Sequence, residues 1–213
     1  MVITKIKKNK LNFDIYIDEE FGFTLTDEGL YKARLKTGME LEITDSFNEV
    51  LRQDEVKRCK NRALKIITDS PKSVNKVKEK LKRELFTEDA MDKAIEFLKD
   101  YKFVNDERLA QNITKRAVRA SSSLRQIKSS LYQKGIQKED IQIALEEVDE
   151  EQEIENAKKV ALKKYNSIKS KSSEDIIKKV YYTLNYKGFS YRSIEKAMKV
   201  VKDILKDRDG EFD

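Results

Sequence analysis

Apolar residues recur at spacings of three and four over most of the chain beyond about residue 46. Leu124, Ile127 and Leu131 form one such stripe, and Ile177, Val180 and Leu184 repeat it 53 residues later. This spacing places side chains on one face of an α-helix. The pattern therefore predicts a succession of amphipathic helices, each with one buried face.

The stripes belong to a longer repeated pattern. "LYQKGIQKEDIQIAL" (Leu131–Leu145) is matched by "LNYKGFSYRSIEKAM" (Leu184–Met198), and a more distant copy precedes the first by 50 residues. Each copy is predicted to form two helices joined by a short turn. Gly135 and Gly188 end the first helix of their copies, because glycine adopts the left-handed conformation that follows a last helical turn. The earliest copy has Leu85 instead, so we expect its helix end to be built differently.

A further helix precedes each pair, which makes the repeat a unit of three helices. In the middle copy this helix is expected to begin at Asn105 or Asp106, and Ser73 and Ser123 are placed to cap the second helices. A long helix over about 46–68 precedes the break "DSPKS", and a longer connection is expected over 167–173. The stripes predicted to be buried on these first helices are Cys59, Ala63 and Ile67; Leu109, Ala110, Ile113 and Ala117; and Ile154, Ala157, Ala161 and Tyr165.

The first 45 residues follow a different pattern. In "LNFDIYID" the apolar residues alternate, which is typical of a half-buried strand. "VITKIKK" before it and "FGFTL" after it can complete a small antiparallel sheet, with Asn9 and Lys10 in the first turn. A short helix is predicted to begin at Asp27 and to end near Gly38.

The predicted fold is mainly α, with three tandem three-helix repeats and a small N-terminal α+β head. We expect the head to span 1–45 and the repeats 46–104, 105–150 and 151–213. Units of about 50 residues bury their apolar faces against their neighbours, so we expect an elongated, curved body.

Composition narrows the class of protein. Charged residues make up 39% of the chain and apolar residues 38%, with one Pro, one Cys and no His. The commonest general base and metal ligand is thus missing. No run of about 18 apolar residues suggests a membrane span. We expect a cytoplasmic, monomeric binding protein with no catalytic residue, metal or cofactor, although a hidden site of carboxylates would support an enzyme.

Charge is segregated in the middle of the chain. Residues 108–138 (the cationic stretch) contain eight basic residues and no acid, and residues 139–155 (the anionic stretch) contain nine acids and no base. The opposite charges could pair with each other across units. Alternatively, the cationic stretch forms a surface that follows a phosphate backbone or an acidic protein patch. Sequence-specific reading of a DNA duplex is disfavoured, because the helix after Gly135 is acidic and would repel it.

Three segments resemble the RecX family of bacterial recombinase regulators. They are "FVNDERLA" (Phe103–Ala110), "SLRQIKSSLYQKGI" (Ser123–Ile136) and "LNYKGFSYRSIEKAM" (Leu184–Met198), and the likeness covers roughly residues 55–205. The resemblance implies a non-enzymatic regulator that binds the RecA recombinase and its filament on single-stranded DNA. It also implies inhibition of the recombinase from the filament groove and a role in DNA recombination, DNA repair and the SOS response.

The residues that we expect to bind the filament are basic and lie on the middle and last repeats. They are Arg116, Arg119, Arg125, Lys128, Lys134, Lys187 and Arg192. The alternative function is a non-specific DNA-binding or scaffold protein that acts without the recombinase.

Overall fold

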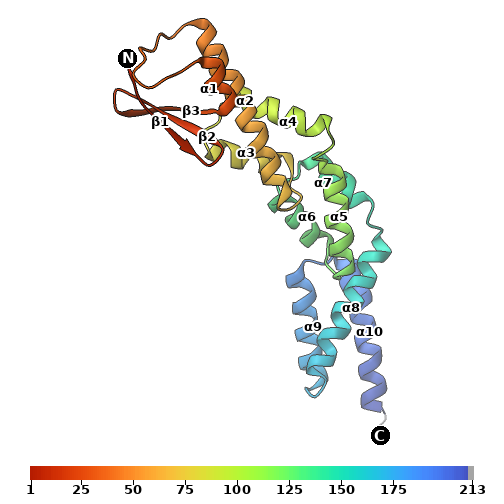
Figure 1. The fold of residues 1–213 in the computed structure, drawn as a ribbon. Helices are drawn as coiled ribbons and strands as arrows, with labels where there is room; N and C mark the ends of the chain where they lie inside the picture. The colour runs from red at the N-terminus through yellow and green to blue at the C-terminus, as the bar shows by residue number, and fades with distance from the viewer. Residues whose placement is uncertain (211–213) are drawn as a thin grey trace. The chain divides into compact units, whose positions relative to one another are not determined.

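The computed structural model describes residues 1–210 of the 213-residue chain. Its described part is mainly helical, with a small sheet at the N-terminus, as the sequence predicts (Figure 1). In chain order the elements are β1 (Ile3–Asn9), β2 (Asn12–Ile17), β3 (Glu20–Thr26), α1 (Asp27–Ala33), α2 (Asp45–Thr68), α3 (Val74–Arg83), α4 (Glu88–Asp100), α5 (Asp106–Arg119), α6 (Leu124–Gln133), α7 (Lys138–Glu146), α8 (Glu150–Ile168), α9 (Ser173–Lys187) and α10 (Tyr191–Gly210). They form two compact units, residues 1–104 and the residues from Asn105 onward.

The first unit begins with the predicted antiparallel sheet, in the order β1-β2-β3. Ile15 pairs with Ile6 on one side and Phe23 on the other. The buried side chains of Ile15 and its neighbours form a small core against α1 and α2. Helix α1 is shorter than the sequence indicated, because Arg34 takes a left-handed conformation with φ 53° and ends the helix.

A buried carboxylate joins this head to the long helix α2. Asp54 on α2 is 4% exposed and accepts hydrogen bonds from the Thr26 backbone N–H at 3.0 Å and from Arg58 Nε at 3.0 Å. The Thr26 hydroxyl also donates to it. The approach is close because α1 has Gly29 here: a Cβ at this position would lie 2.1 Å from Asp54 Oδ1.

The first repeat consists of α2, α3 and α4, packed around an apolar core. The core includes Cys59 and Ala63, as predicted, but Ile66 is buried where the sequence pattern favoured Ile67. Ile67 is only partly buried at the edge of the same core. The break before α3 is made by Ser73, whose hydroxyl accepts a hydrogen bond from the Lys76 backbone N–H.

The second unit contains the second repeat (α5–α7) and the third repeat (α8–α10), each with its own core. In the third repeat, Ile154, Ala157 and Ala161 are buried as predicted. On α9, however, Ile176 is buried in place of Ile177, which is only partly buried. The α8–α9 connection is also shorter than expected, because α8 continues to Ile168.

The turn between the second and third helices contains a left-handed residue in all three repeats. Gly135 and Gly188 have φ values of 74° and 77°, and Leu85 has a φ of 62°. Leu85 thus takes the left-handed conformation of the two glycines, but its helix end is still built differently. The Leu131 and Leu184 carbonyls accept hydrogen bonds from the Ile136 and Phe189 N–H groups, whereas the Leu81 carbonyl accepts one from the Glu84 N–H. A leucine in this region is strained, since its Cβ crowds the backbone, and its side chain is 89% exposed.

Candidate functional site

The cationic stretch lies mostly on α5 and α6, the first two helices of the second repeat (Figure 1). Asn105 begins α5 by accepting a 2.7 Å hydrogen bond from the Arg108 backbone N–H. Ser123 begins α6, and its side chain and that of Gln126 accept hydrogen bonds from each other's backbone N–H. Such caps satisfy donors that a helix start leaves free.

Four of the predicted binding residues are exposed on these helices: Arg116, Arg119, Arg125 and Lys128. Arg116 and Arg119 lie one turn apart at the end of α5, and Lys128 lies in α6. Within residues 1–210, none of the three forms an ion pair. We call these three residues the cationic surface. Their charges face solvent and can meet a phosphate or carboxylate of a partner. Lys134, also predicted, is exposed at the end of α6.

Arg125 instead contacts the third repeat. Its Nη2 donates a 3.2 Å hydrogen bond to the Tyr186 backbone carbonyl near the end of α9. Its guanidinium lies against Gly188, since a Cβ at Gly188 would be 2.2 Å from Arg125 Nε. At least part of the donor capacity of Arg125 is therefore used within the molecule, at the junction of the two repeats.

Of the two predicted residues of the third repeat, Lys187 lies at the same junction, and Arg192 pairs within its own repeat. The Lys187 backbone carbonyl accepts a 2.6 Å hydrogen bond from the Ser123 hydroxyl. Arg192 Nη1 lies 2.7 Å from Glu150 Oε2 on α8, in an exposed ion pair. The structure thus brings Arg125 and Lys187 to one junction, whereas Arg116, Arg119 and Lys128 belong to the open faces of α5 and α6.

A buried carboxylate lies at the centre of this junction. Glu153 on α8 is 3% exposed. Its Oε1 accepts a 3.1 Å hydrogen bond from the Leu124 backbone N–H at the start of α6, and its Oε2 accepts one of 3.0 Å from the Ser193 hydroxyl on α10. A carboxylate at a helix start is stabilised by the free N–H groups and the helix dipole. One side chain of α8 therefore connects the second repeat to the last helix.

The charge pattern of the sequence did not reveal this role, because Glu153 is one of nine acids in the anionic stretch. A usable signal was its position: Glu153 precedes Ala157 by four residues, and Ala157 precedes Ala161 by four. That spacing places Glu153 on the buried stripe of α8.

A second buried polar side chain of α8 also contacts the second repeat. Asn156 is 1% exposed and donates a 3.2 Å hydrogen bond to the Ser122 carbonyl.

The sequence left open whether the anionic stretch neutralises the cationic stretch by direct pairing. Apart from Lys134, no basic residue of the cationic stretch forms an ion pair with an acid of the anionic stretch within the described part of the chain. Glu150 and Glu155 pair with basic residues beyond both stretches, and Glu147 accepts a 2.8 Å hydrogen bond from Gln111. For these residues, the charge segregation is not explained by internal ion pairing.

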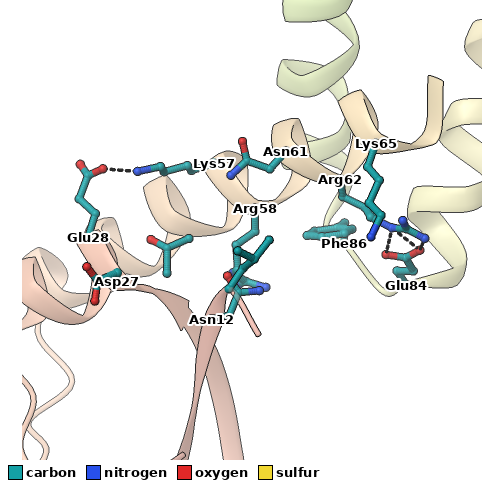
Figure 2. Close-up of a pocket in the computed structure, with 12 residues that line it drawn as sticks. Asn12, Asp27, Glu28, Lys57, Arg58, Asn61, Arg62, Lys65, Glu84 and Phe86 are labelled. Carbon is teal, nitrogen blue, oxygen red and sulfur yellow. Dashed lines mark hydrogen bonds and ion pairs between the residues drawn. The ribbon is translucent and has the colours of Figure 1, made fainter. Parts of the chain in front are cut away.

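The first unit contains a pocket of about 650 Å³, drawn in Figure 2. The turn between β1 and β2, the start of α1, the outer face of α2 and the connection after α3 line it. Its charges are largely paired: Lys57 reaches Glu28, and the guanidinium of Arg62 faces both carboxylate oxygens of Glu84. Lys32 and Lys57 lower the pKa of Glu28 to about 2, and Glu84 raises the pKa of Arg62. This pocket offers no strongly charged surface.

The chain has one cysteine, and its thiol lies in the core of the first repeat. Cys59 is fully buried, and burial raises the pKa of its thiol to about 12, so the nucleophilic thiolate is suppressed. Among residues 1–210, no group of three or more Cys, Asp or Glu side chains could hold a metal ion. The helices described also include none long and apolar enough to cross a membrane.

Comparison with known proteins connects these features to a family. Models of the regulatory protein RecX N-terminal domain, the first RecX three-helix domain and the third RecX three-helix domain match residues 1–42, 59–98 and 150–198. The regulatory protein RecX of Clostridioides difficile is 36% identical over 201 residues, which cover 92% of this chain and 94% of that protein. The chain belongs to the RecX family. RecX of Clostridium beijerinckii is likewise 36% identical and covers 95% of both chains.

Solved RecX structures share this fold. A crystal structure of a regulatory protein RecX matches with a TM-score of 0.67 and 25% identity, and covers 95% of this chain and 100% of that one. RecX from Lactobacillus salivarius matches with a TM-score of 0.65 over 70% of this chain and 98% of that one, at 24% identity. The mainly helical architecture of three-helix repeats after a small head is therefore that of the RecX family.

Proposed function

We propose that this protein binds the RecA recombinase filament on single-stranded DNA and inhibits the recombinase from the filament groove. Membership of the RecX family, a family of regulatory proteins, supports this role. The observation that carries the proposal is the cationic surface: Arg116, Arg119 and Lys128 are exposed and unpaired within the described residues. A filament of protein and DNA presents both carboxylates and phosphates to such a surface.

The division of the basic residues refines the proposed contacts. Arg116, Arg119, Lys128 and Lys134 are the residues that we assign to the filament. Arg125 acts first in joining the repeats, through the Tyr186 carbonyl, and Arg192 pairs with Glu150 within the third repeat. Lys187 meets the Ser123 hydroxyl through its backbone carbonyl, so its side chain stays a candidate for the filament. Several repeats on one chain can touch successive recombinase subunits, so contacts that are weak one by one act together through effective concentration.

The test is the ATPase activity of the recombinase on single-stranded DNA, measured while the purified protein is added. We expect inhibition at protein concentrations well below those that saturate the DNA. Inhibition that appears only when the protein coats all of the DNA would instead favour a non-specific DNA-binding protein, and the proposal would fail.

The matched variant is the triple change Arg116→Glu, Arg119→Glu, Lys128→Glu, which leaves Arg125 in place to hold the junction. A control with the same change of charge reverses Lys80, Arg83 and Lys99. These residues are exposed and, like Arg116 and Arg119, lie in the last turns of their helices, α3 and α4. We expect the first variant to lose inhibition at moderate salt and the control to keep it. Equal inhibition by both variants would contradict the assignment of the cationic surface.

A further inference from the structure

A second surface lies in the third repeat, in a groove between α9 and α10. The groove has a volume of about 830 Å³, and no pattern in the sequence predicted it. Its apolar lining includes Ile177 of α9 and Ile194 and Met198 of α10. Both helices also pack on α8, so the groove belongs to one three-helix bundle (Figure 1).

Three tyrosines present their rings to solvent around this groove. Tyr181 and Tyr182 come from α9 and Tyr191 from the start of α10, and their exposed fractions are 44%, 69% and 80%. The rings of Tyr181 and Tyr182 meet edge to face, with centroids 6.4 Å apart. Single exposed aromatics are ordinary on protein surfaces, but three around one groove mark a binding surface.

A row of lysines borders the same groove. Lys196, Lys199 and Lys202 recur every three residues along α10, so they lie on one side of the helix about one turn apart. Within residues 1–210, none of the three forms an ion pair. The lining as a whole has five lysines and two carboxylates, those of Glu195 and Asp203, and so carries a net positive charge.

We propose that the groove between α9 and α10 binds single-stranded DNA, with bases stacked on the tyrosines and phosphates held by the lysine row. Proteins that bind single strands without sequence preference combine these two features, a positively charged groove and exposed aromatic faces. Lysine suits this task because its compact charge contacts a phosphate without requiring one orientation. A DNA duplex would hide its base faces from the tyrosines.

This site rests on the proposed function, because the single-stranded DNA that it would bind is the DNA of the recombinase filament. It also gives the second and third repeats different tasks. Tyr132 is the one aromatic residue of the cationic stretch, so the second repeat is suited to backbone or protein contacts. The third repeat supplies the base stacking. The carboxylates of an acidic peptide also match the charge of the groove, but they have no flat rings to cover three tyrosines.

The experiment measures binding of the full chain to a fluorescein-labelled oligodeoxythymidine of 20 nucleotides by fluorescence anisotropy. An abasic strand of the same length and a polyglutamate peptide serve as the other two probes. The test variant is Tyr181→Ala, Tyr182→Ala, Tyr191→Ala. The control variant, Tyr31→Ala with Tyr186→Ala, removes two tyrosines that are 83% and 86% exposed but do not line the groove. Circular dichroism checks that each variant is folded.

We expect the test variant to bind oligodeoxythymidine at least about tenfold more weakly than wild type, since each stacked base contributes substantially. The control variant should bind as wild type does, and wild type should bind the abasic strand as weakly as the test variant binds oligodeoxythymidine. A triple change of Lys196, Lys199 and Lys202 to Gln should reduce the slope of log affinity against log salt by about 2.

The proposal is overturned if the test variant binds oligodeoxythymidine like wild type, or if the abasic strand binds equally well. Loss of polyglutamate binding without loss of oligodeoxythymidine binding would assign the groove to an acidic peptide instead. No recombinase is present in these measurements. Normal DNA binding without inhibition of the recombinase would therefore contradict the proposed function alone, and inhibition with no role for the tyrosines would contradict this site alone.

Discussion

The Ser123 hydroxyl donates a 2.6 Å hydrogen bond to the backbone carbonyl of Lys187, 64 residues further along the chain. The same oxygen accepts a 3.2 Å hydrogen bond from the Gln126 backbone N–H at the start of α6. The carbonyl groups in the last turn of a helix have no partner within that helix. The Ser123 side chain therefore provides a hydrogen-bond acceptor at the start of α6, in the second repeat, and a donor at the end of α9, in the third.

Removing the carboxylate at this junction should destabilise the second unit. In Glu153→Ala the Leu124 N–H and the Ser193 hydroxyl lose their acceptor in a buried place, which we expect to cost about 2–4 kcal/mol. Urea unfolding followed by circular dichroism measures the loss. Glu151→Ala, on the exposed side of the same first turn of α8, is the matched control. Equal stability of the two variants would show that the buried hydrogen bonds contribute nothing.

Replacing Gly188 by alanine should destabilise the protein more than replacing Gly38, another glycine with a left-handed backbone. Gly38 has φ 84° and open space where a Cβ would be, whereas a Cβ at Gly188 (φ 77°) would meet the Arg125 guanidinium. We expect Gly38→Ala to cost about 1 kcal/mol, from backbone strain alone, and Gly188→Ala about 2 kcal/mol. Thermal unfolding gives both values.

The excess at Gly188 should depend on Arg125. In an Arg125→Ala background the obstacle is gone, so Gly188→Ala should then cost about as much as Gly38→Ala. An unchanged cost in that background would mean that the strain lies in the backbone and that the guanidinium does not lie against Gly188.

The first unit should loosen when Asp54 is replaced. Asp54→Ala removes the acceptor of the Thr26 N–H and leaves Arg58 without its partner, and we expect a loss of about 2–3 kcal/mol. Hydrogen exchange should show faster exchange of the amides of β3 and α1. Glu49→Ala, which removes an exposed carboxylate from the same helix, should leave these amides protected. Unchanged protection in Asp54→Ala would contradict the view that this carboxylate holds the head on α2.

Cys59 should resist alkylation in the folded protein. Its pKa is raised from 9.0 to about 12, because burial disfavours the thiolate. At pH 8 the thiolate fraction of the folded protein is then about a thousandfold lower than that of the unfolded chain. We expect iodoacetamide to react slowly without urea and rapidly in unfolding concentrations of urea, as followed by mass spectrometry. Equal rates under the two conditions would place the thiol at the surface.

Local signals in the sequence predicted much of the fold. Ser73, Asn105 and Ser123 begin helices as expected, because a cap depends on residues within one turn. Gly135 and Gly188 end theirs for the same reason. Leu85 gave no signal for the left-handed conformation that it takes, because leucine does not favour this conformation by itself.

The candidate site was less predictable, because its contacts join distant residues. The sequence identified the cationic stretch, but nothing in it showed that Arg125 would turn toward Tyr186, 61 residues away. The tyrosines of α9 and α10 are also separated along the chain, and they surround one groove only after the two helices pack. Glu153 looked like one acid among many until burial distinguished it.

The junction also has a consequence for the order in which the protein matures on the ribosome. A nascent chain folds from its N-terminus as it emerges, and residues 1–104 form their compact unit from their own segments. The start of α6 cannot form all of its hydrogen bonds at first. The Leu124 N–H has an acceptor only after Glu153 has been synthesised, and the Ser123 hydroxyl has one only after Lys187 has been synthesised. A chain whose translation stops after residue 150 should therefore carry a finished first unit and an incomplete second repeat, open to proteolysis.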